Sequence, residues 1–252
     1  MDFRPCIDLH QGKVKQIVGD TLNEVGKPVV ENYISTYKSN HYAEMFQRDG
    51  LKGGHVIMLG DGNQEAALEA LNAYPNGLQI GGGMNADNAS FYLENGASHV
   101  IVTSYIFQNG ELNKERLEKL LDTIGKDKLV IDLSCKQKDG KWFVVTDKWT
   151  KFSQIEINQE TIREFEQYCD EFLIHAADVE GKRSGFEANL VEKLADWVSI
   201  PTTYAGGIRS MEDLDHFREL SKGKLDITIG SALDIFGGEL SYQEVVAYCH
   251  HK

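Results

Sequence analysis

The tripeptide Ile-Asp-Leu occurs twice in this chain, each time at the end of an apolar run that is typical of a buried strand. The two aspartates, Asp8 and Asp132, are 124 positions apart. The glycine pairs at 82–83 and 206–207 keep the same spacing. A spacing that is shared by unrelated motifs indicates internal duplication.

A third pair of motifs fits the same repeat. Thr103-Ser104 and Gly230-Ser231 each follow an apolar run and are 127 positions apart, which allows a small insertion in the second copy. We therefore expect two similar halves, near residues 1–125 and 126–252, each with one carboxylate and one glycine-rich loop.

The order of the expected elements favours a single barrel. Apolar, β-branched runs alternate with helical patterns, which is typical of βαβ units around a parallel sheet. Eight strands and 252 residues fit one (βα)8 TIM barrel, a single domain over residues 1–252 built from duplicated half-barrels. The expected strands are 4–9, 55–59, 78–80, 99–103, 129–133, 171–175, 201–204 and 226–229.

Helices are expected between these strands, at 40–50, 64–73, 86–95, 113–124, 159–169, 187–196, 211–221 and 241–249. Two loops are longer than a barrel needs, at 10–38 and 134–158. The second contains Asp139-Gly140 between strand-forming residues, which predicts a hairpin. Both loops leave the C-terminal ends of their strands, the face where barrel enzymes keep their sites.

The charge balance bounds the partners. The formal net charge is −13, so we expect neither nucleic acid nor an anionic membrane as a partner. Since the overall field repels anions, a phosphorylated ligand has to be met by local backbone amides and a few cations. No apolar run approaches ~20 residues, so no membrane-spanning helix is expected.

Cysteine usage predicts a reducing compartment. The four cysteines contain no Cys-x-x-Cys pair, so a zinc knuckle is not expected and the thiols are expected to be reduced. Strand-forming residues directly after Met1 leave no room for a signal peptide. We expect a cytoplasmic protein and a monomer.

Asp8 and Asp132 are the candidate catalytic groups. Each ends a buried strand and points at the barrel mouth. The first and fifth strands lie on opposite sides of a barrel, so the pair suits acid and base work on one substrate. The alternative for each residue is a structural role, in which it caps a loop or accepts from backbone amides.

The glycine-rich loops are candidate phosphate sites. Glycine allows the backbone to approach a phosphate closely, and N–H groups at a helix N-terminus bond its oxygens. A lone Gly-Gly is usually just a turn, but two such sets predict a ligand with a phosphate at each end. The two sets are Gly82, Gly83, Thr103 and Ser104, and Gly206, Gly207, Gly230 and Ser231.

The sixth strand leads into a polar loop that starts at His175. His175 is a candidate for hydrogen bonding or proton transfer, and Lys182 and Arg183 either meet phosphate or are simply solvated. His55 and His99 begin their strands, so we expect them at the opposite end of the barrel from His175, without a metal cluster. Serine-nucleophile and dinucleotide signatures are missing from the sequence.

Four motifs carry a resemblance to a known family: Arg-Pro-Cys-Ile-Asp-Leu-His-Gln-Gly-Lys-Val-Lys-Gln at 4–16, the triple glycine at 81–83, Ile-Asp-Leu at 131–133 and Ala-Gly-Gly-Ile at 205–208. Together they resemble the phosphoribosylformimino-5-aminoimidazole carboxamide ribotide isomerase family of histidine biosynthesis, in particular its eukaryotic branch. The likeness spans nearly the whole chain.

This resemblance implies a (βα)8 barrel without metal or cofactor and an Amadori-type aldose-to-ketose rearrangement of a bis-phosphorylated small molecule. It assigns Asp8 as the base that removes the ribose C2 proton and Asp132 as the acid that opens the furanose ring. It also adds Lys13 to the expected binding residues. Bacterial members usually have Thr and Asp where this chain has His175 and Glu180, so Glu180 joins the candidate binding set with Arg183.

Two other readings compete with this one. The sister cyclase of the same pathway shares the duplicated barrel and the paired aspartates but is a lyase that uses ammonia from a glutaminase partner. The first loop, Asp-Leu-His-Gln-Gly-Lys-Val, differs from the pattern expected of the cyclase. A non-catalytic phosphate-binding scaffold is the second alternative, because fold alone does not fix function.

Overall fold

Eight parallel strands form the centre of the computed structural model, which describes residues 1–17, 31–146, 149–179 and 185–250. Their hydrogen-bonded order is β15-β14-β13-β9-β6-β5-β4-β1, so neighbours along the chain are neighbours in the sheet. The barrel strands are β1 (Cys6–His10), β4 (Gly54–Met58), β5 (Leu78–Gly81), β6 (Val100–Val102), β9 (Leu129–Asp132), β13 (Glu171–His175), β14 (Thr202–Ala205) and β15 (Asp226–Thr228).

The segment before β1 joins the two ends of this sheet. Phe3 forms a parallel bridge with Ile227 of β15. Two backbone hydrogen bonds flank the bridge: Arg4 N donates to Ile227 O at 2.8 Å, and Ile227 N donates to Asp2 O at 3.0 Å. The predicted (βα)8 barrel is therefore confirmed, with its seam between the first and the last strand.

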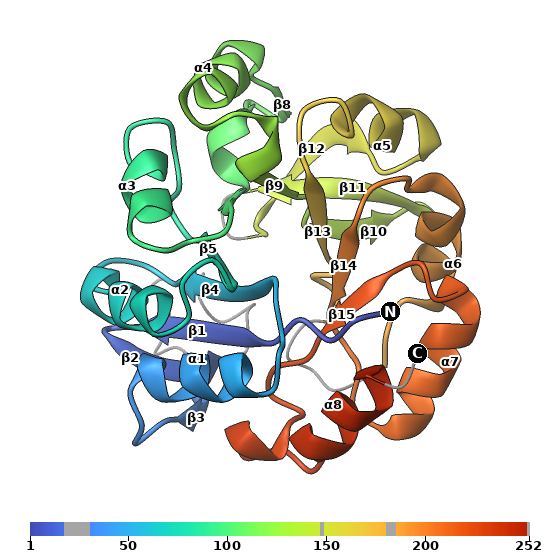
Figure 1. Cartoon of the computed structure of the whole chain (residues 1–252). Coiled ribbons are helices and arrows are strands. Elements are labelled where there is room, and N and C mark those ends of the chain that lie inside the picture. The colour runs from blue at the N-terminus through green and yellow to red at the C-terminus, as the bar shows by residue number, and fades with distance from the viewer. Residues whose placement is uncertain (18–30, 147–148, 180–184, 251–252) are drawn as a thin grey trace.

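In the described part of the chain, eight α-helices surround the strands (Figure 1). All eight predicted helices are present, as are all eight predicted strands. The helices are α1 (Ser39–Arg48), α2 (Gln64–Ala73), α3 (Ala89–Glu94), α4 (Lys114–Ile124), α5 (Gln159–Phe165), α6 (Ala188–Trp197), α7 (Met211–Ser221) and α8 (Tyr242–His250), and the short 3-10 turns are η2 (Ser104–Ile106), η3 (Lys126–Lys128) and η4 (Asp234–Phe236).

Helix α4 shows how the local sequence sets these elements. The side chain of Asn113 accepts a hydrogen bond from the Arg116 N–H, which caps the first turn. Leu117 and Leu120 share the buried face. Gly125 ends the helix with a φ of 75°, a conformation that suits glycine.

Helix α3 begins three residues later than predicted. The backbone N–H of Asn85 donates to the Asn88 side chain at 2.9 Å, and the N–H of Asp87 donates to the Asn85 side chain at 2.8 Å. These local bonds give the backbone an alternative to helical pairing. The first regular turn therefore forms only from Ala89 onward.

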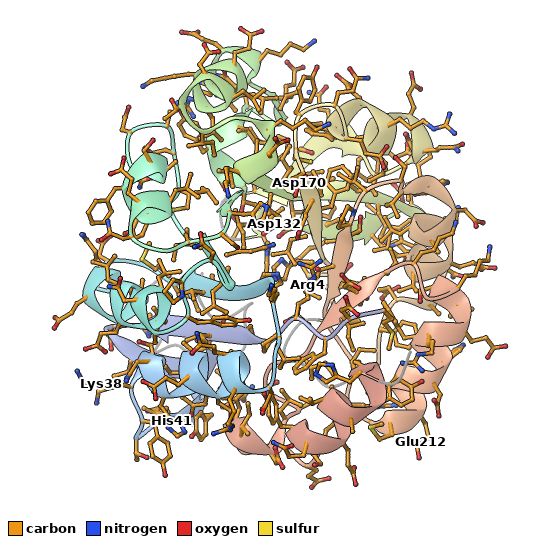
Figure 2. All side chains as sticks on the ribbon, in the orientation of Figure 1. Arg4, Lys38, His41, Asp132, Asp170 and Glu212 are labelled. Atoms are coloured by element: carbon orange, nitrogen blue, oxygen red, sulfur yellow. The ribbon has the colours of Figure 1, made fainter. Side chains whose placement is uncertain are left out.

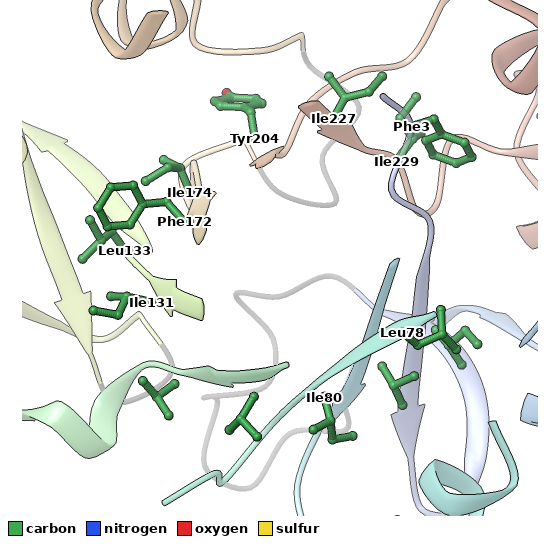
Figure 3. Packing of buried hydrophobic residues seen from close by; sticks show 14 of the residues in the cluster. Phe3, Leu78, Ile80, Ile131, Leu133, Phe172, Ile174, Tyr204, Ile227 and Ile229 are labelled. Carbon is green, nitrogen blue, oxygen red and sulfur yellow. The ribbon is translucent and has the colours of Figure 1, made fainter. Parts of the chain in front are cut away.

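Alternate residues of each strand face the helices and form the main core (Figure 3). Ile131 and Leu133 of the β9 segment and Phe172 and Ile174 of β13 are all fully buried there. Their neighbours in sequence point into the barrel instead. Four buried residues form a small apolar cluster inside the barrel, namely Ile101, Val130, Leu173 and Ala205.

Hairpins follow the first and the fifth barrel strand. The first, β2 (Lys13–Ile17) with β3 (Glu31–Ile34), continues the barrel sheet at β1. The second, β10 (Cys135–Lys138), β11 (Lys141–Thr146) and β12 (Lys151–Glu156), forms a separate sheet. Asp139 and Gly140 have positive φ values of 52° and 76°, as a two-residue hairpin turn requires, so the predicted hairpin is confirmed.

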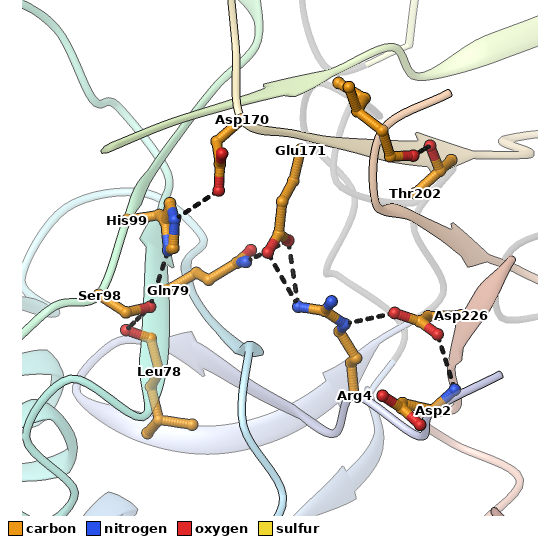
Figure 4. Close-up of polar contacts among 11 residues, drawn as sticks. Asp2, Arg4, Leu78, Gln79, Ser98, His99, Asp170, Glu171, Thr202 and Asp226 are labelled. Atoms are coloured by element: carbon orange, nitrogen blue, oxygen red, sulfur yellow. Dashed lines mark hydrogen bonds and ion pairs between the residues drawn. The ribbon is translucent and has the colours of Figure 1, made fainter. Parts of the chain in front are cut away.

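The N-terminal end of the barrel is closed by an ionic network (Figure 4). Arg4 donates through Nη1 to Glu171 at 3.1 Å and through Nε to Asp226 at 2.9 Å. Burial acts to lower the pKa of Arg4, but the two carboxylates outweigh this effect and raise it. Gln79 donates to Glu171 at 2.7 Å. The network therefore links β5, β13 and β15 with the segment before β1.

Candidate active site

Asp8 lies near the C-terminal end of β1 and is held by a residue from the adjacent hairpin. The amide Nε2 of Gln16 donates to Asp8 Oδ2 at 2.9 Å. Gln16 is 4% exposed, whereas Asp8 is half-buried. A charge-assisted hydrogen bond of this length fixes the carboxylate more firmly than a neutral one does.

Asp132 ends β9 and is held by residues of the barrel itself. Its Oδ1 accepts from Ser134 Oγ at 2.9 Å and lies 3.3 Å from His175 Nδ1. Its Oδ2 accepts from Thr103 Oγ1 at 3.3 Å. Asp132 is 8% exposed and lies within the ring of strands in Figure 2.

The strand order places these two carboxylates on opposite sides of the barrel. β1 is the first barrel strand and β9 is the fifth, with β4, β5 and β6 between them on one side. Asp8 is paired with Ile57 of β4, and Asp132 with Leu173 of β13, so both sit at the C-terminal ends of their strands. The predicted position of both aspartates at the mouth is confirmed.

A cavity at the mouth brings Asp8 together with His175. The cavity is also lined by Gln16 and by the loops after β14 and β15. His175 in turn contacts Asp132, so this histidine lies between the cavity and the second aspartate.

The predicted second glycine set lines this cavity. Gly206 and Gly207 have φ values of 121° and 85°, and a side chain at Gly207 would begin 2.1 Å from the Gly185 carbonyl oxygen. Only glycine satisfies both conditions. Gly230 and Ser231, after β15, line the same cavity. This set therefore sits beside Asp8.

The predicted first glycine set lies apart from that cavity. Gly82 and Gly83, after β5, have φ values of 94° and 74°, and Gly83 borders open space. Thr103 directs its hydroxyl to Asp132, while Ser104 starts η2. Ser104 lines a separate hollow of about 760 Å³, with Arg116 and Lys151 among its other residues.

Three further candidates lie elsewhere. Lys13 is exposed at the start of β2, next to the turn, and is not among the described residues that line the mouth cavity. Glu180 and Arg183 lie outside the described residues, as does Lys182. Their proposed roles in binding stay predictions.

The expected position of His55 was wrong. His55 pairs with Cys6 in the ladder and points into the barrel, where it lines the same cavity as Asp8 and His175. Burial, with the charges of His175 and Arg4, lowers the pKa of His55 to about 3, so its ring is neutral at pH 7. An inward side chain one residue into a strand reaches the middle layer of a barrel rather than its far end.

His99 does lie at the N-terminal end of the barrel, but it has acidic neighbours that we had not expected. Its ring and the carboxylates of Asp170 and Glu171 offer ligand atoms within 4.8 Å of one another, and His99 Nε2 is 3.2 Å from Asp170 (Figure 4). Glu171 is already bonded to Arg4 and Gln79. This arrangement is an ionic network far from the mouth.

Gln16 and His55 are the site residues that sequence reasoning missed. The signal for Gln16 was the long loop expected at 10–38, because this loop leaves the C-terminal end of the strand that carries Asp8. His55 carried the same alternation signal as Cys6 and Asp8. Neither signal fixes which side chain reaches the carboxylate.

The fold and the position of the site define the class: this is a (βα)8 barrel whose polar residues gather at the C-terminal ends of its strands, where barrel enzymes keep their active sites. The histidine biosynthesis protein family matches residues 3–241. The chain belongs to this family.

Three curated relatives illustrate the similarity. All three are named 1-(5-phosphoribosyl)-5-((5-phosphoribosylamino)methylideneamino) imidazole-4-carboxamide isomerase. The protein of Medicago truncatula, described as chloroplastic, is 51% identical over 98% of this chain and 81% of its own length. That of Neurospora crassa is 50% identical over 98% and 97%. That of Saccharomyces cerevisiae is 47% identical over 94% of each chain.

Proposed function

We infer that this chain is the same isomerase of histidine biosynthesis, which converts an N-linked aminoaldose to the corresponding aminoketose by an Amadori rearrangement. The observation that carries this inference is the similarity of about half the residues over nearly the whole chain to relatives that bear this name. The two opposed aspartates at the barrel mouth agree with it, because such a reaction needs both an acid and a base.

In the proposed mechanism, the furanose ring opens first. The Asp132 and His175 pair, whose atoms lie 3.3 Å apart, supplies a proton to the ring oxygen while the glycosidic nitrogen forms a C=N bond to C1. Asp8 then removes the proton from C2, which gives an enol-amine. C1 gains a proton and the 2-hydroxyl loses one, so the product is an isomer of the substrate.

Two anion sites are proposed for the ends of the substrate. One phosphate lies against the loops of Gly206, Gly207, Gly230 and Ser231, and the other against those of Gly82, Gly83, Thr103 and Ser104. Open space at Gly83 and the position of Gly207 and Gly230 along the mouth cavity support this placement. Binding at both ends holds the sugar between the carboxylates.

The direct test is to incubate the purified chain with the aminoaldose substrate without ammonia or glutaminase. We expect the aminoaldose to be converted to the aminoketose. The conversion is monitored by absorbance, or by chromatography that separates the two isomers, which have the same mass. Tight binding without turnover favours the scaffold reading, and turnover of the aminoketose with ammonia favours the cyclase reading. Either result, in place of isomerisation, rejects the proposal.

We also propose a reducing compartment such as the cytoplasm. All four cysteines are buried free thiols. Among the described residues, none of the helices has the length and apolar character needed to cross a bilayer. Fractionation of the source cells, with this protein detected by antibody, tests the compartment.

A further inference from the structure

The Gln16 side chain connects the proposed base with a loop of the proposed anion site. Its Nε2 lies 2.9 Å from Asp8 Oδ2 and 3.9 Å from Cys6 Sγ. Its Oε1 faces Gly230, where an added Cβ would lie only 2.4 Å away. Gln16 is 4% exposed and lines the mouth cavity. Its amide nitrogen therefore faces Asp8, and its amide oxygen faces Gly230.

The hairpin explains why this residue reaches Asp8. The strand β2 pairs antiparallel with β1 through Leu9 and Val14, and with β3 through Gln16 and Tyr33. A register shift follows Gln16, between Gln16 and Ile17. Such irregularities bend a strand and re-aim a side chain. The Gln16 amide accordingly lies beside Asp8 of β1.

We propose that Gln16 is a positioning residue for the isomerisation: its amide holds Asp8 Oδ2 so that the carboxylate faces the substrate carbon. The inference rests on the function proposed above. A base gains most from fixed orientation, because a displacement of about 1 Å costs on the order of 10²-fold in rate.

The same contact explains the glycine at position 230. The backbone of Gly230 does not have a positive φ, so its conformation alone does not demand glycine. The space for a Cβ is taken by Gln16 Oε1. A larger residue at 230 would displace the amide and with it the hydrogen bond to Asp8, so the anion loop and the base share one side chain.

The alternative is that Gln16 only fills space under the cavity. If Gln16 only fills space, a side chain of similar shape should replace it without a change in kcat. If Gln16 positions Asp8, the loss of its amide donor should lower kcat. Gln16→Met keeps the length and apolar bulk but removes the amide donor. Gln16→Glu keeps the shape and places a second carboxylate beside Asp8. The matched control is Gln159→Met, an exposed glutamine at the start of α5.

The experiment first measures the wild-type chain, whose failure to isomerise would reject the proposed function itself. With an active wild type, we expect Gln16→Met to lower kcat ~10-fold or more with KM within about 2-fold. Gln159→Met should match the wild type, and thermal midpoints should agree among all three proteins. A Gln16→Met variant with wild-type kcat overturns the inference.

The pH profile gives an independent readout of the contact between residue 16 and Asp8. In Gln16→Glu, two adjacent carboxylates resist shared ionisation, so the acid limb of kcat/KM should move up by about one pH unit or more. The other described titratable groups facing the cavity are Cys6, His55 and His175, and the variant leaves them in place. An unmoved acid limb with unchanged kcat contradicts the proposal, even if Gln16→Met fails to fold.

A double-mutant cycle tests the link to Gly230. We expect Gly230→Ala to lower kcat in the wild type, because the new methyl group displaces Gln16. In a Gln16→Ala background the space is empty, so the added effect of Gly230→Ala should be several-fold smaller. Full additivity of the two substitutions would show that the residues act separately, and the proposed coupling would be wrong.

Discussion

The two halves of the barrel hold equivalent aspartates by different means. In the first half, Asp8 is oriented by Gln16, which comes from a hairpin outside the set of eight barrel strands. In the second half, Asp132 accepts from Ser134, just after β9, and from Thr103, just after β6 of the first half. The orientation of Asp8 therefore depends on the β2–β3 hairpin, whereas that of Asp132 depends on residues that directly follow barrel strands.

The hairpins that follow these aspartates differ in the same sense. The first hairpin is hydrogen-bonded to β1 and extends the barrel sheet, so that a shift of β2 moves the partner of Asp8 directly. The second forms its own sheet around the buried residues Trp142 and Val144. None of the described side chains that donate to Asp132 belongs to that second sheet.

The largest expected loss of activity is the same for the aspartates of both halves. Asp8→Asn and Asp132→Asn should each lower kcat by ~10²- to 10⁴-fold, as expected for the loss of a general base or acid. Circular dichroism and thermal midpoints should remain near those of the wild type. Near-normal turnover in one variant would reject the role of that aspartate and break the symmetry of the comparison.

Truncation of the two hairpin cores should separate stability from activity. Trp142→Ala, at a ring that is 5% exposed, should lower the free energy of unfolding by roughly 3 kcal/mol with little change in kcat. Val14→Ala, at a side chain that is 1% exposed, should cost less stability but lower kcat, because β2 carries Gln16. Urea unfolding and steady-state kinetics measure both. A fall in kcat confined to Trp142→Ala would contradict the comparison.

The dependence of stability on acid pH should differ between His55 and Glu171, which occupy equivalent positions in the two halves of the barrel. Cys6 pairs with His55 and Val130 with Glu171, at the same distance before each aspartate. Glu171 is ion-paired with Arg4, whereas burial holds the pKa of His55 at about 3, below its ordinary value of 6.5. Stability due to the neutral His55 is complete above pH 6.5 and is lost as the pH falls from 6.5 toward 3.

Between pH 7 and pH 5, this linkage should remove about 2 kcal/mol from the free energy of unfolding. His55→Gln cannot gain a proton, so its loss over the same interval should be smaller by that amount. Urea unfolding at both pH values measures the difference. Equal losses in the two proteins would show that His55 takes up a proton in the folded state.

The smallest expected effect concerns the donors to Asp132. Ser134→Ala and Thr103→Val each remove one hydrogen bond to a carboxylate that keeps its other contacts. We expect kcat to fall only ~3- to 10-fold in each variant, about 1 kcal/mol of orientation. A larger loss than in Gln16→Met would reverse the conclusion that Asp8 is the less firmly supported aspartate.

The sequence predicted the elements and the carboxylates because their signals are local and repeated. The spacing of 124 residues places Asp8 and Asp132 at equivalent strand ends, and the structure has them at the first and the fifth strand. The Asp139-Gly140 turn followed from the positive φ that a two-residue hairpin needs. Each of these features depends on residues that are close in the chain.

The contacts between side chains were beyond such reasoning. That Gln16 rather than Lys13 reaches the site depends on strand twist and on a register shift, neither of which leaves a residue pattern. The layer of His55 depends on how far the strands are staggered around the barrel. The seam at Phe3 and Ile227 joins residues from opposite ends of the chain, and no periodicity announces such a pairing.

That seam has a practical consequence for building with this protein. Asp2, Phe3, Cys249 and His250 border one hollow on the face where the strands begin, so the described residues near both ends of the chain lie close together. A short linker could join them, and new termini could be opened at the exposed Gly125, between the halves. Such a permuted gene would encode the second half first while every strand keeps its neighbours.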